Sequence, residues 1–340
     1  MLLLKGWRNI LVRFNDNKNI AFIVPTGIGA SIGGYAGDAG AYAREFAKYT
    51  NLIVNPNVVN AGGFSAITPS MLYVEGYTLD SFFKNECSLV PSQNNSIGII
   101  YDKAIPDDVL NVHINTQNAV KTVYGVDIHA YEVTDEEVGV EFFVTEDGIS
   151  TGTVRNIKTI ESACKNLINK GCNAIAIVCL FDDSEDSNPD YANGIGADPV
   201  GGVEAIISHY ISKYFKVPCA HSPAFCDYNI YPDIVNPKSA SEYITPTFLP
   251  CILLGLSQAP VIFSDPNFGL NINDLDALVM PYNSLGSIPV YEAVKRNIPV
   301  YAILENSTEI NVSKDKLFSN ETNIIPVPTY EKCLDIILKD

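Results

Sequence analysis

Residues Asn19–Gly33 read NIAFIVPTGIGASIG, an apolar run followed by a loop rich in glycine. Ile20–Val24 form a continuous apolar run, which is typical of a buried strand. A loop in which glycine recurs follows, and Asp38 is then expected to cap a helix that ends near Tyr49. A strand, a glycine-rich loop and a helix in this order form half of a βαβ unit and therefore predict a parallel sheet.

Strands and helices continue to alternate along the rest of the chain. We expect strands at 10–14, 52–54, 97–101, 127–133, 138–144, 174–180, 217–220, 277–280 and 300–304. We expect helices at 107–124, 159–170, 201–214, 239–256, 288–296 and 331–339, and a polar loop with a functional or lid role at 182–199. The pattern predicts an α/β protein with largely parallel, Rossmann-like sheets in three layers and Gly-rich loops at the strand carboxyl ends.

The length of 340 residues fits two domains or one large α/β unit. We expect an N-terminal α/β domain over residues 1–155, which carries the glycine-rich loop, and a C-terminal α/β domain over residues 156–340. The alternative is one continuous unit with the site between the two halves.

Composition and charge exclude several classes of protein. The chain has 22 basic and 39 acidic residues, a formal net charge of −17, and 47% hydrophobic residues. The apolar content excludes a disordered chain, and the acidity argues against nucleic acid or an anionic membrane as partner. No signal-peptide core or membrane span stands out, and the eight cysteines form no CxxC pair, so we expect a cytoplasmic protein with reduced thiols.

The loop after the first strand is a candidate ligand site, because ligands of parallel sheets collect at the carboxyl ends of the strands. Its spacing is GxGxxxG rather than the GxGxxG of dinucleotide-binding folds, and a P-loop ATPase is excluded. A dinucleotide cofactor, a smaller phosphate or carboxylate held by backbone amides, and a structural turn all stay open. The candidate ligand-binding residues in this loop are Thr26, Gly27, Gly29, Gly33, Gly34 and Asp38.

Two later loops add polar candidates. Asn57 and Asn60 follow the second strand, where they would line a polar pocket or satisfy one another in a tight turn. Asp198, Gly201 and Gly202 precede the helix at 201–214, and glycines at a helix start suit an anion seat or a moving lid.

Small and polar residues also follow the strands of the last βαβ unit. Ser284, Gly286 and Asn306 occupy these positions. They suit hydrogen bonds to a polar metabolite, and ordinary turn chemistry explains them equally.

Cys219 and His221 form the most reactive pair, because residues two apart in a strand project to the same side. An imidazole beside a thiol would help to hold the thiolate as a nucleophile. The alternative is a buried cysteine beside a histidine that hydrogen-bonds a loop carbonyl. A zinc site with His209 and Cys226 lacks a recognised spacing, so no metal site is predicted.

Three further residues complete the catalytic candidates. His209 is a second candidate base, and Glu204 or Glu75 would orient a histidine. Glu204 and His209 are five residues apart on one helix and do not share a face well. Glu75 lies among aromatic residues, where its pKa would be raised, or is solvated at a turn.

Several motifs resemble an uncharacterised "domain of unknown function" family best known from photosynthetic lineages. The resemblance covers roughly residues 20–310 and implies kinship without an assigned reaction. The motifs that carry it are PTGIG at 25–29, GGYAGD at 33–38, NPNVVNA at 55–61, LYVEGY at 72–77, GVEAIISH at 202–209, VPCAHSPA at 217–224 and TFLPC at 247–251.

Three classes of function follow from these candidates. The favoured one is a small-molecule enzyme acting on an anionic carboxylate or phosphate metabolite, with thiol-assisted transfer, hydrolysis or isomerisation at a carbonyl. The alternatives are a nucleotide- or NAD(P)-dependent enzyme and a non-catalytic metabolite-binding protein. The cofactor is open, and a homodimer is expected from the frequency of such assemblies.

Overall fold

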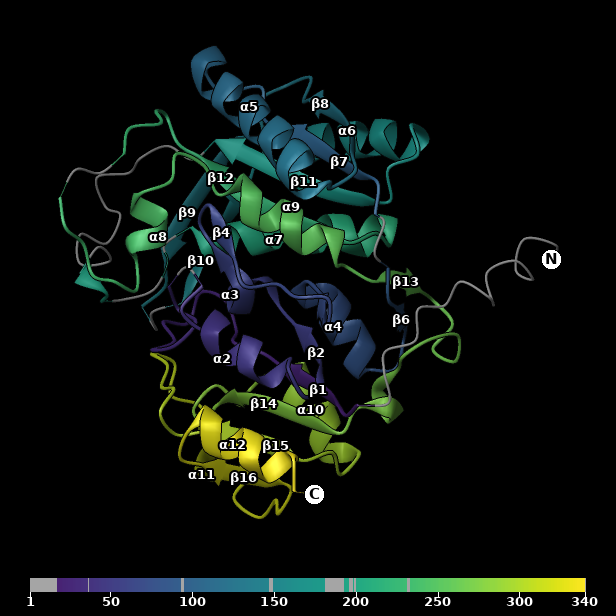
Figure 1. The fold of residues 1–340 in the computed structure, drawn as a ribbon, viewed down its shortest axis with the longest axis vertical. Coiled ribbons are helices and arrows are strands. Elements are labelled where there is room, and N and C mark those ends of the chain that lie inside the picture. Colours follow the sequence, from purple (N-terminus) through teal and green to yellow (C-terminus); the bar gives the residue numbers. More distant parts are fainter. Residues whose placement is uncertain are drawn as a thin grey trace.

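A computed structural model gives the arrangement of the chain (Figure 1). It describes residues 17–35, 37–92, 95–146, 149–180, 193–195, 198, 200–230 and 233–339. The strand expected at 10–14 lies outside these residues, as does most of the loop at 182–199.

The first of two large sheets has six parallel strands in the order β5-β2-β1-β14-β15-β16. Numbered along the chain, this order is 3-2-1-4-5-6, the arrangement of doubly wound Rossmann folds. Ile20 pairs with Leu52 on one side and with Ala277 on the other. The strands are β1 (Asn19–Phe22), β2 (Asn51–Val54), β5 (Met71–Tyr73), β14 (Ala277–Pro281), β15 (Val300–Ile303) and β16 (Ile324–Val327).

Helices cover both faces of this sheet, because its strands are apolar on both sides. Ile20 and Phe22 of β1 pack on the side of α2 (Gly40–Phe46), α3 (Pro56–Val59) and α12 (Tyr330–Ile337). Ala21 and Ile23 pack on the side of α4 (Gly76–Phe83) and α10 (Ile288–Lys295). The three layers that the sequence predicts are therefore confirmed for this sheet.

The second sheet has four parallel strands in the order β12-β11-β7-β8. Its strands are β7 (Ile97–Tyr101), β8 (Ile128–Val133), β11 (Ala174–Leu180) and β12 (Cys219–Ala224). The buried residues of α5 (Asp107–Tyr124) and α9 (Leu249–Ser257) pack on one face, and those of α6 (Ile157–Asn169) and α7 (Gly201–Phe215) on the other.

The second sheet is inserted between the third and fourth strands of the first. The chain leaves through β6 (Ser88–Val90) and returns through β13 (Val261–Phe263), which pair antiparallel and lie side by side in Figure 1. Helix α9 packs against β11 and β12 and against the hairpin of β3 (Asn60–Ala61) and β4 (Phe64–Ser65). A boundary at residue 155 therefore cuts through the second sheet, while both ends of the chain build the first.

Local differences from the sequence expectations concern helix ends. Helix α2 begins at Gly40 with Ala39 at its N-cap, so the prediction that Asp38 caps this helix is wrong. Asp38 instead accepts a hydrogen bond from the Gly33 backbone N–H. The helix expected at 239–256 is divided into α8 (Ala240–Tyr243) and α9.

The remaining elements of the described residues are the hairpin β9 (Val140–Val144) and β10 (Ser150–Val154), the 3-10 helix η2 (Ile272–Asp274) and α11 (Lys314–Leu317).

Candidate functional site

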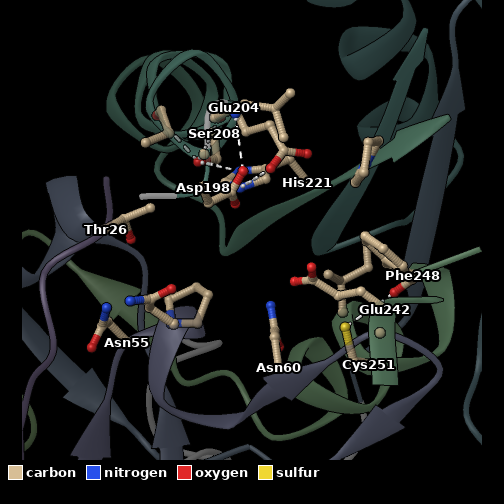
Figure 2. Close-up of a pocket in the computed structure, with 18 of the residues that line it drawn as sticks. Thr26, Asn55, Asn60, Asp198, Glu204, Ser208, His221, Glu242, Phe248 and Cys251 are labelled. Atoms are coloured by element: carbon tan, nitrogen blue, oxygen red, sulfur yellow. Dashed lines mark hydrogen bonds and ion pairs between the residues drawn. The ribbon is translucent and has the colours of Figure 1, made fainter. Parts of the chain in front are cut away.

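A cavity of about 910 Å³ lies between the carboxyl edge of the first sheet and the inserted unit. Loops after β1, β2 and β5 line it, together with β12, α7, α8 and the start of α9. Figure 2 shows Asp198, Glu204, Ser208 and His221 gathered on one wall, with Asn55 and Asn60 on the opposite wall. Ligand-sized space therefore occurs where the doubly wound topology predicts it.

The asparagine wall is held by hydrogen bonds to main-chain and side-chain groups. The Asn55 amide joins the ends of β1 and β2, because it accepts from the Val24 N–H at 3.1 Å and donates to the Val24 carbonyl at 2.7 Å. Asn57 donates to the Gly33 carbonyl, and Asn60 donates to the Tyr73 hydroxyl at 3.1 Å. Asn57 and Asn60 line the cavity, but neither satisfies the other.

His221 is fixed by a serine from the facing helix. Its Nδ1 lies 3.0 Å from Ser208 Oγ, and that hydroxyl donates to the carbonyls of Glu204 and Ala205 one turn earlier in α7. The serine oxygen therefore accepts from His221 Nδ1–H, which leaves Nε2 as the unprotonated nitrogen. Nε2 lies 3.6 Å from Glu204 Oε2.

Burial controls the charge of this pair. It raises the pKa of the Glu204 carboxyl well above its ordinary value, and the charges of Asp198 and Glu242 add to the effect. Burial also lowers the pKa of His221 to about 3, with a further contribution from His209. Both directions favour uncharged forms, so a carboxylic acid stands beside a neutral imidazole.

A second histidine–glutamate pair lines the same cavity. His209 Nε2 lies 3.7 Å from Glu75 Oε2, and the imidazole is 44% exposed while the carboxyl is 3% exposed. Glu75 caps α4, since it accepts hydrogen bonds from the N–H groups of Tyr77 and Thr78. Burial raises the Glu75 pKa, while those hydrogen bonds oppose the shift, so the expectation of a solvated turn is wrong.

Gly76 makes the approach of His209 possible. A Cβ atom at this position would lie 2.4 Å from His209 Nε2, which is closer than real Cβ contacts. The glycine therefore permits the imidazole to rest over the start of α4, beside the carboxyl that caps it.

The predicted glycine-rich loop is largely structural. Gly27, Gly29 and Gly33 adopt positive φ angles and do not line the cavity, although Thr26 and Gly34 do. The Ser31 N–H donates to the Ser307 carbonyl at 2.7 Å, so a second loop covers the place where a pyrophosphate would lie.

Asn306 anchors that covering loop and is fully buried. Its Oδ1 accepts from the Ile32 N–H at 3.0 Å, and its Nδ2 donates to the Tyr330 hydroxyl at 2.7 Å. Ser284 is also buried and donates to the Pro281 carbonyl at 3.2 Å. With Gly286 and Asp38, these residues lie outside the lining of the cavity.

The expected anion seat at the start of α7 holds a carboxyl group of the chain itself. Asp198 accepts a hydrogen bond from the Val200 N–H at 3.0 Å, and Asp198 and Gly201 line the cavity. Gly202 instead packs on β10, because a Cβ atom there would lie 1.9 Å from the Ser150 carbonyl oxygen. The Gly202 N–H donates to Ser150 Oγ at 3.1 Å.

The structure argues against the predicted thiol nucleophile. Strand β12 does extend through His221, but Cys219 is 1% exposed, belongs to the core between β12 and α7, and does not line the cavity. Burial raises the pKa of its thiol well above the ordinary value, which opposes thiolate formation.

A model of the family described as "Protein of unknown function (DUF3326)" matches residues 19–339. The chain belongs to this family. An uncharacterized lipoprotein of Synechococcus sp. is 36% identical over 296 residues, which are 85% of this chain and 82% of the relative. No solved structure matches the chain.

The resemblance to an uncharacterised family is therefore confirmed. Several residues that line the cavity were not among the candidate site residues. Asn55, Ser208 and Glu242 line the cavity, together with the aromatic residues Tyr35 and Phe248. Four of these five residues lie in the motifs NPNVVNA, GVEAIISH, GGYAGD and TFLPC, and Glu242 lies in none of the quoted motifs. Among the helices of the described ranges, none combines the length and apolar character that a membrane span requires.

Proposed function

We propose that the protein is a small-molecule enzyme that transfers protons on its substrate, with isomerisation beside a carbonyl as the reaction class. One observation carries the proposal: two histidines, each within 4 Å of a buried glutamate, line a single cavity. Two acid–base groups around one substrate allow a proton to be removed at one atom and returned at another.

His221 acts as the base in this proposal. Its ring is oriented by Ser208 and is uncharged, so the lone pair of Nε2 faces the cavity free of a proton. When substrate binding ionises Glu204, its carboxylate stabilises the imidazolium that His221 forms. Ser208 itself is unsuited to be a nucleophile, because it lies in the middle of α7 and its hydroxyl donates to carbonyls of its own helix.

His209 supplies the second acid–base group. Glu75 faces it while held by the first turn of α4, so the carboxyl cannot rotate away without losing two backbone hydrogen bonds. The half-exposed imidazole can exchange protons with both substrate and solvent. This arrangement suits the return of a proton after its removal by His221.

The charge of the lining bears on the substrate that the sequence favoured. Among the described residues that line the cavity there is no lysine or arginine, whereas the carboxyl groups of Asp198 and Glu242 act electrostatically on that of Glu204. An anionic carboxylate or phosphate would therefore lack a cationic partner. The nucleotide alternative loses support as well, since the loop at 306–309 covers the glycine-rich turn.

Deuterium incorporation tests the proposal even while the substrate is unidentified. The protein is incubated in D2O with fractionated metabolites from its host, and mass spectrometry identifies compounds that gain deuterium or change structure. We expect the wild type and the exposed-site control His129→Asn to act alike. His221→Asn should lower the rate at least about 100-fold, since general acid–base groups contribute roughly 10²–10⁴.

Two outcomes would contradict the proposal. One is an unchanged rate in His221→Asn. The other is a wild-type protein that retains a metabolite through purification but alters none, which would identify a non-catalytic binding protein.

The cytoplasm stays our proposed location. All eight cysteines carry free thiols, and seven of them are buried, which suits a reducing compartment. The relative's description as a lipoprotein favours a membrane-attached alternative, and fractionation of native cells distinguishes the two. The homodimer likewise stays a prediction, and light scattering tests it.

A further inference from the structure

Acidic side chains outnumber basic ones in the lining of the cavity. Within the described part of the chain its lining contains six carboxyl groups and two histidines but neither lysine nor arginine. The carboxyl groups belong to Glu75, Asp80, Asp198, Glu204, Asp227 and Glu242. A cavity of this charge attracts a cation and repels an anion.

One of these carboxyl groups has an oxygen without a partner. Glu204 is 6% exposed, and its Oε1 is buried without a hydrogen-bond partner among the described residues. A buried acceptor left unsatisfied costs about 1–3 kcal/mol. A ligand that brings an N–H donor to this oxygen would recover that free energy.

Aromatic rings surround the same space. Those that line it are Tyr35, Phe142, Phe225, Tyr228, Tyr243 and Phe248. The face of an aromatic ring attracts a cation, and the rings also bury an organic body. Both properties fit an organic cation better than a hydrated ion.

A metal ion fits the geometry less well. No group of three or more histidine, cysteine or acidic side chains within the described residues is arranged to hold one. Asp198 and Glu204 lie on the α7 side and Glu242 lies across the cavity in Figure 2. Carboxyl groups on different walls suit a larger cation that spans them.

We propose that the substrate carries a primary or secondary ammonium group, which donates a hydrogen bond to Glu204 and is attracted by Asp198 and Glu242. The inference rests on the proposed function only in taking this cavity as the substrate site. A quaternary ammonium lacks the N–H donor that Glu204 Oε1 would accept, so it fits less well.

Binding of an ammonium group would be linked to proton release. A cation beside Glu204 favours the ionised carboxylate, which burial otherwise disfavours, so the group would lose its proton as the ligand enters. The titratable groups that face or couple to Glu204 are His221, Asp198, Glu242, Tyr73, Cys179 and Cys251.

Isothermal titration calorimetry with matched probes tests the inference on the full chain. One series is 1,4-diaminobutane, 1,4-butanediol and succinate, and the other is 2-phenylethylamine, 2-phenylethanol and 3-phenylpropionate. We expect at least one amine to bind with a Kd at least tenfold below those of its alcohol and its carboxylate. Its heat should change between phosphate and Tris buffers, because protons are released.

One variant and a control locate the site. Glu204→Gln keeps the shape of the side chain and should weaken amine binding at least tenfold and abolish the buffer dependence. Glu321→Gln, on an exposed loop, should change neither. Calorimetry measures binding without turnover, so failure of the catalytic proposal would not be mistaken for failure of this one.

Any other ranking of the probes overturns the inference, including tighter binding of a carboxylate or no preference for an amine. Amine binding that Glu204→Gln leaves unchanged would also overturn it. Titration with Mg²⁺ and Zn²⁺ completes the set, and binding of either ion without amine binding would assign the carboxyl groups to a metal instead.

Discussion

We expect His221→Asn to lose less stability at acidic pH than the wild type does. A free histidine titrates near 6.5, whereas burial holds the pKa of folded His221 at about 3. Between these values the unfolded chain binds a proton that the folded protein does not bind. The contribution of His221 to the free energy of unfolding is therefore complete above pH 6.5 and is lost progressively as the pH falls toward 3.

The size of this effect follows from the pH chosen. At pH 5, about 1.5 below the ordinary pKa, the unfolded state gains roughly 2 kcal/mol from protonation at ~1.36 kcal/mol per pH unit. The folded protein gains almost nothing at that pH. The imidazole is 17% exposed, so solvent screening reduces the effect little.

Urea unfolding at pH 7.5 and pH 5.0 measures the difference. The wild type should lose about 2 kcal/mol more than His221→Asn, and His129→Asn, at an exposed position on β8, should behave as the wild type does. The raised pKa of Glu204 acts in the opposite direction but is present in both proteins. Equal acid losses in wild type and His221→Asn would refute the reasoning.

Three other substitutions have defined outcomes. Cys219→Ala should leave deuterium exchange and amine binding intact and should lower the free energy of unfolding by about 1–2 kcal/mol. Loss of exchange in a folded Cys219→Ala variant would instead show that the thiol takes part in the reaction. Asn306→Ala should lower the free energy of unfolding by about 3–5 kcal/mol in urea, because buried groups including the Tyr330 hydroxyl lose their partner. Gly76→Ala should displace His209 without unfolding α4; an unchanged His209 resonance in NMR spectra would contradict this.

Local sequence signals predicted the long elements well. The helix expected at 107–124 has these bounds in the structure, with Pro106 at its N-cap and Gly125 in the left-handed region at its C-cap. The strand expected at 174–180 is likewise β11. Such elements are specified by residues within them and at their ends, so periodicity and capping are sufficient.

Short elements and strand partners could not be predicted in this way. Strands β5 and β16 have three and four residues, too few for a period to be recognised. The pairing of Ile20 with Ala277 depends on the whole intervening chain, and no local pattern reports it. The insertion of the second sheet between the strands of the first depends on the same distant pairings.

For the site, residue types were easier to predict than partners. His221, Glu204, His209 and Glu75 were all candidates, and all four line the cavity. The expected partner of His221 was Cys219, two residues away in the strand. The structure instead pairs it with Ser208 and Glu204, because α7 packs across β12. Contacts between two separate elements do not produce a recognisable residue spacing in the sequence.

The insertion has a consequence for synthesis on the ribosome. The Asn19 backbone N–H donates a hydrogen bond to the Asp276 side chain, 257 residues later. Strand β1 lacks one of its two neighbouring strands until β14 pairs beside it. At roughly 5–20 residues per second, β1 waits about 13–50 s for that neighbour. During this interval β1 is an unpaired edge, and the later-made inserted sheet can finish first. A circular permutant that begins at β14 would shorten the delay and should aggregate less during translation.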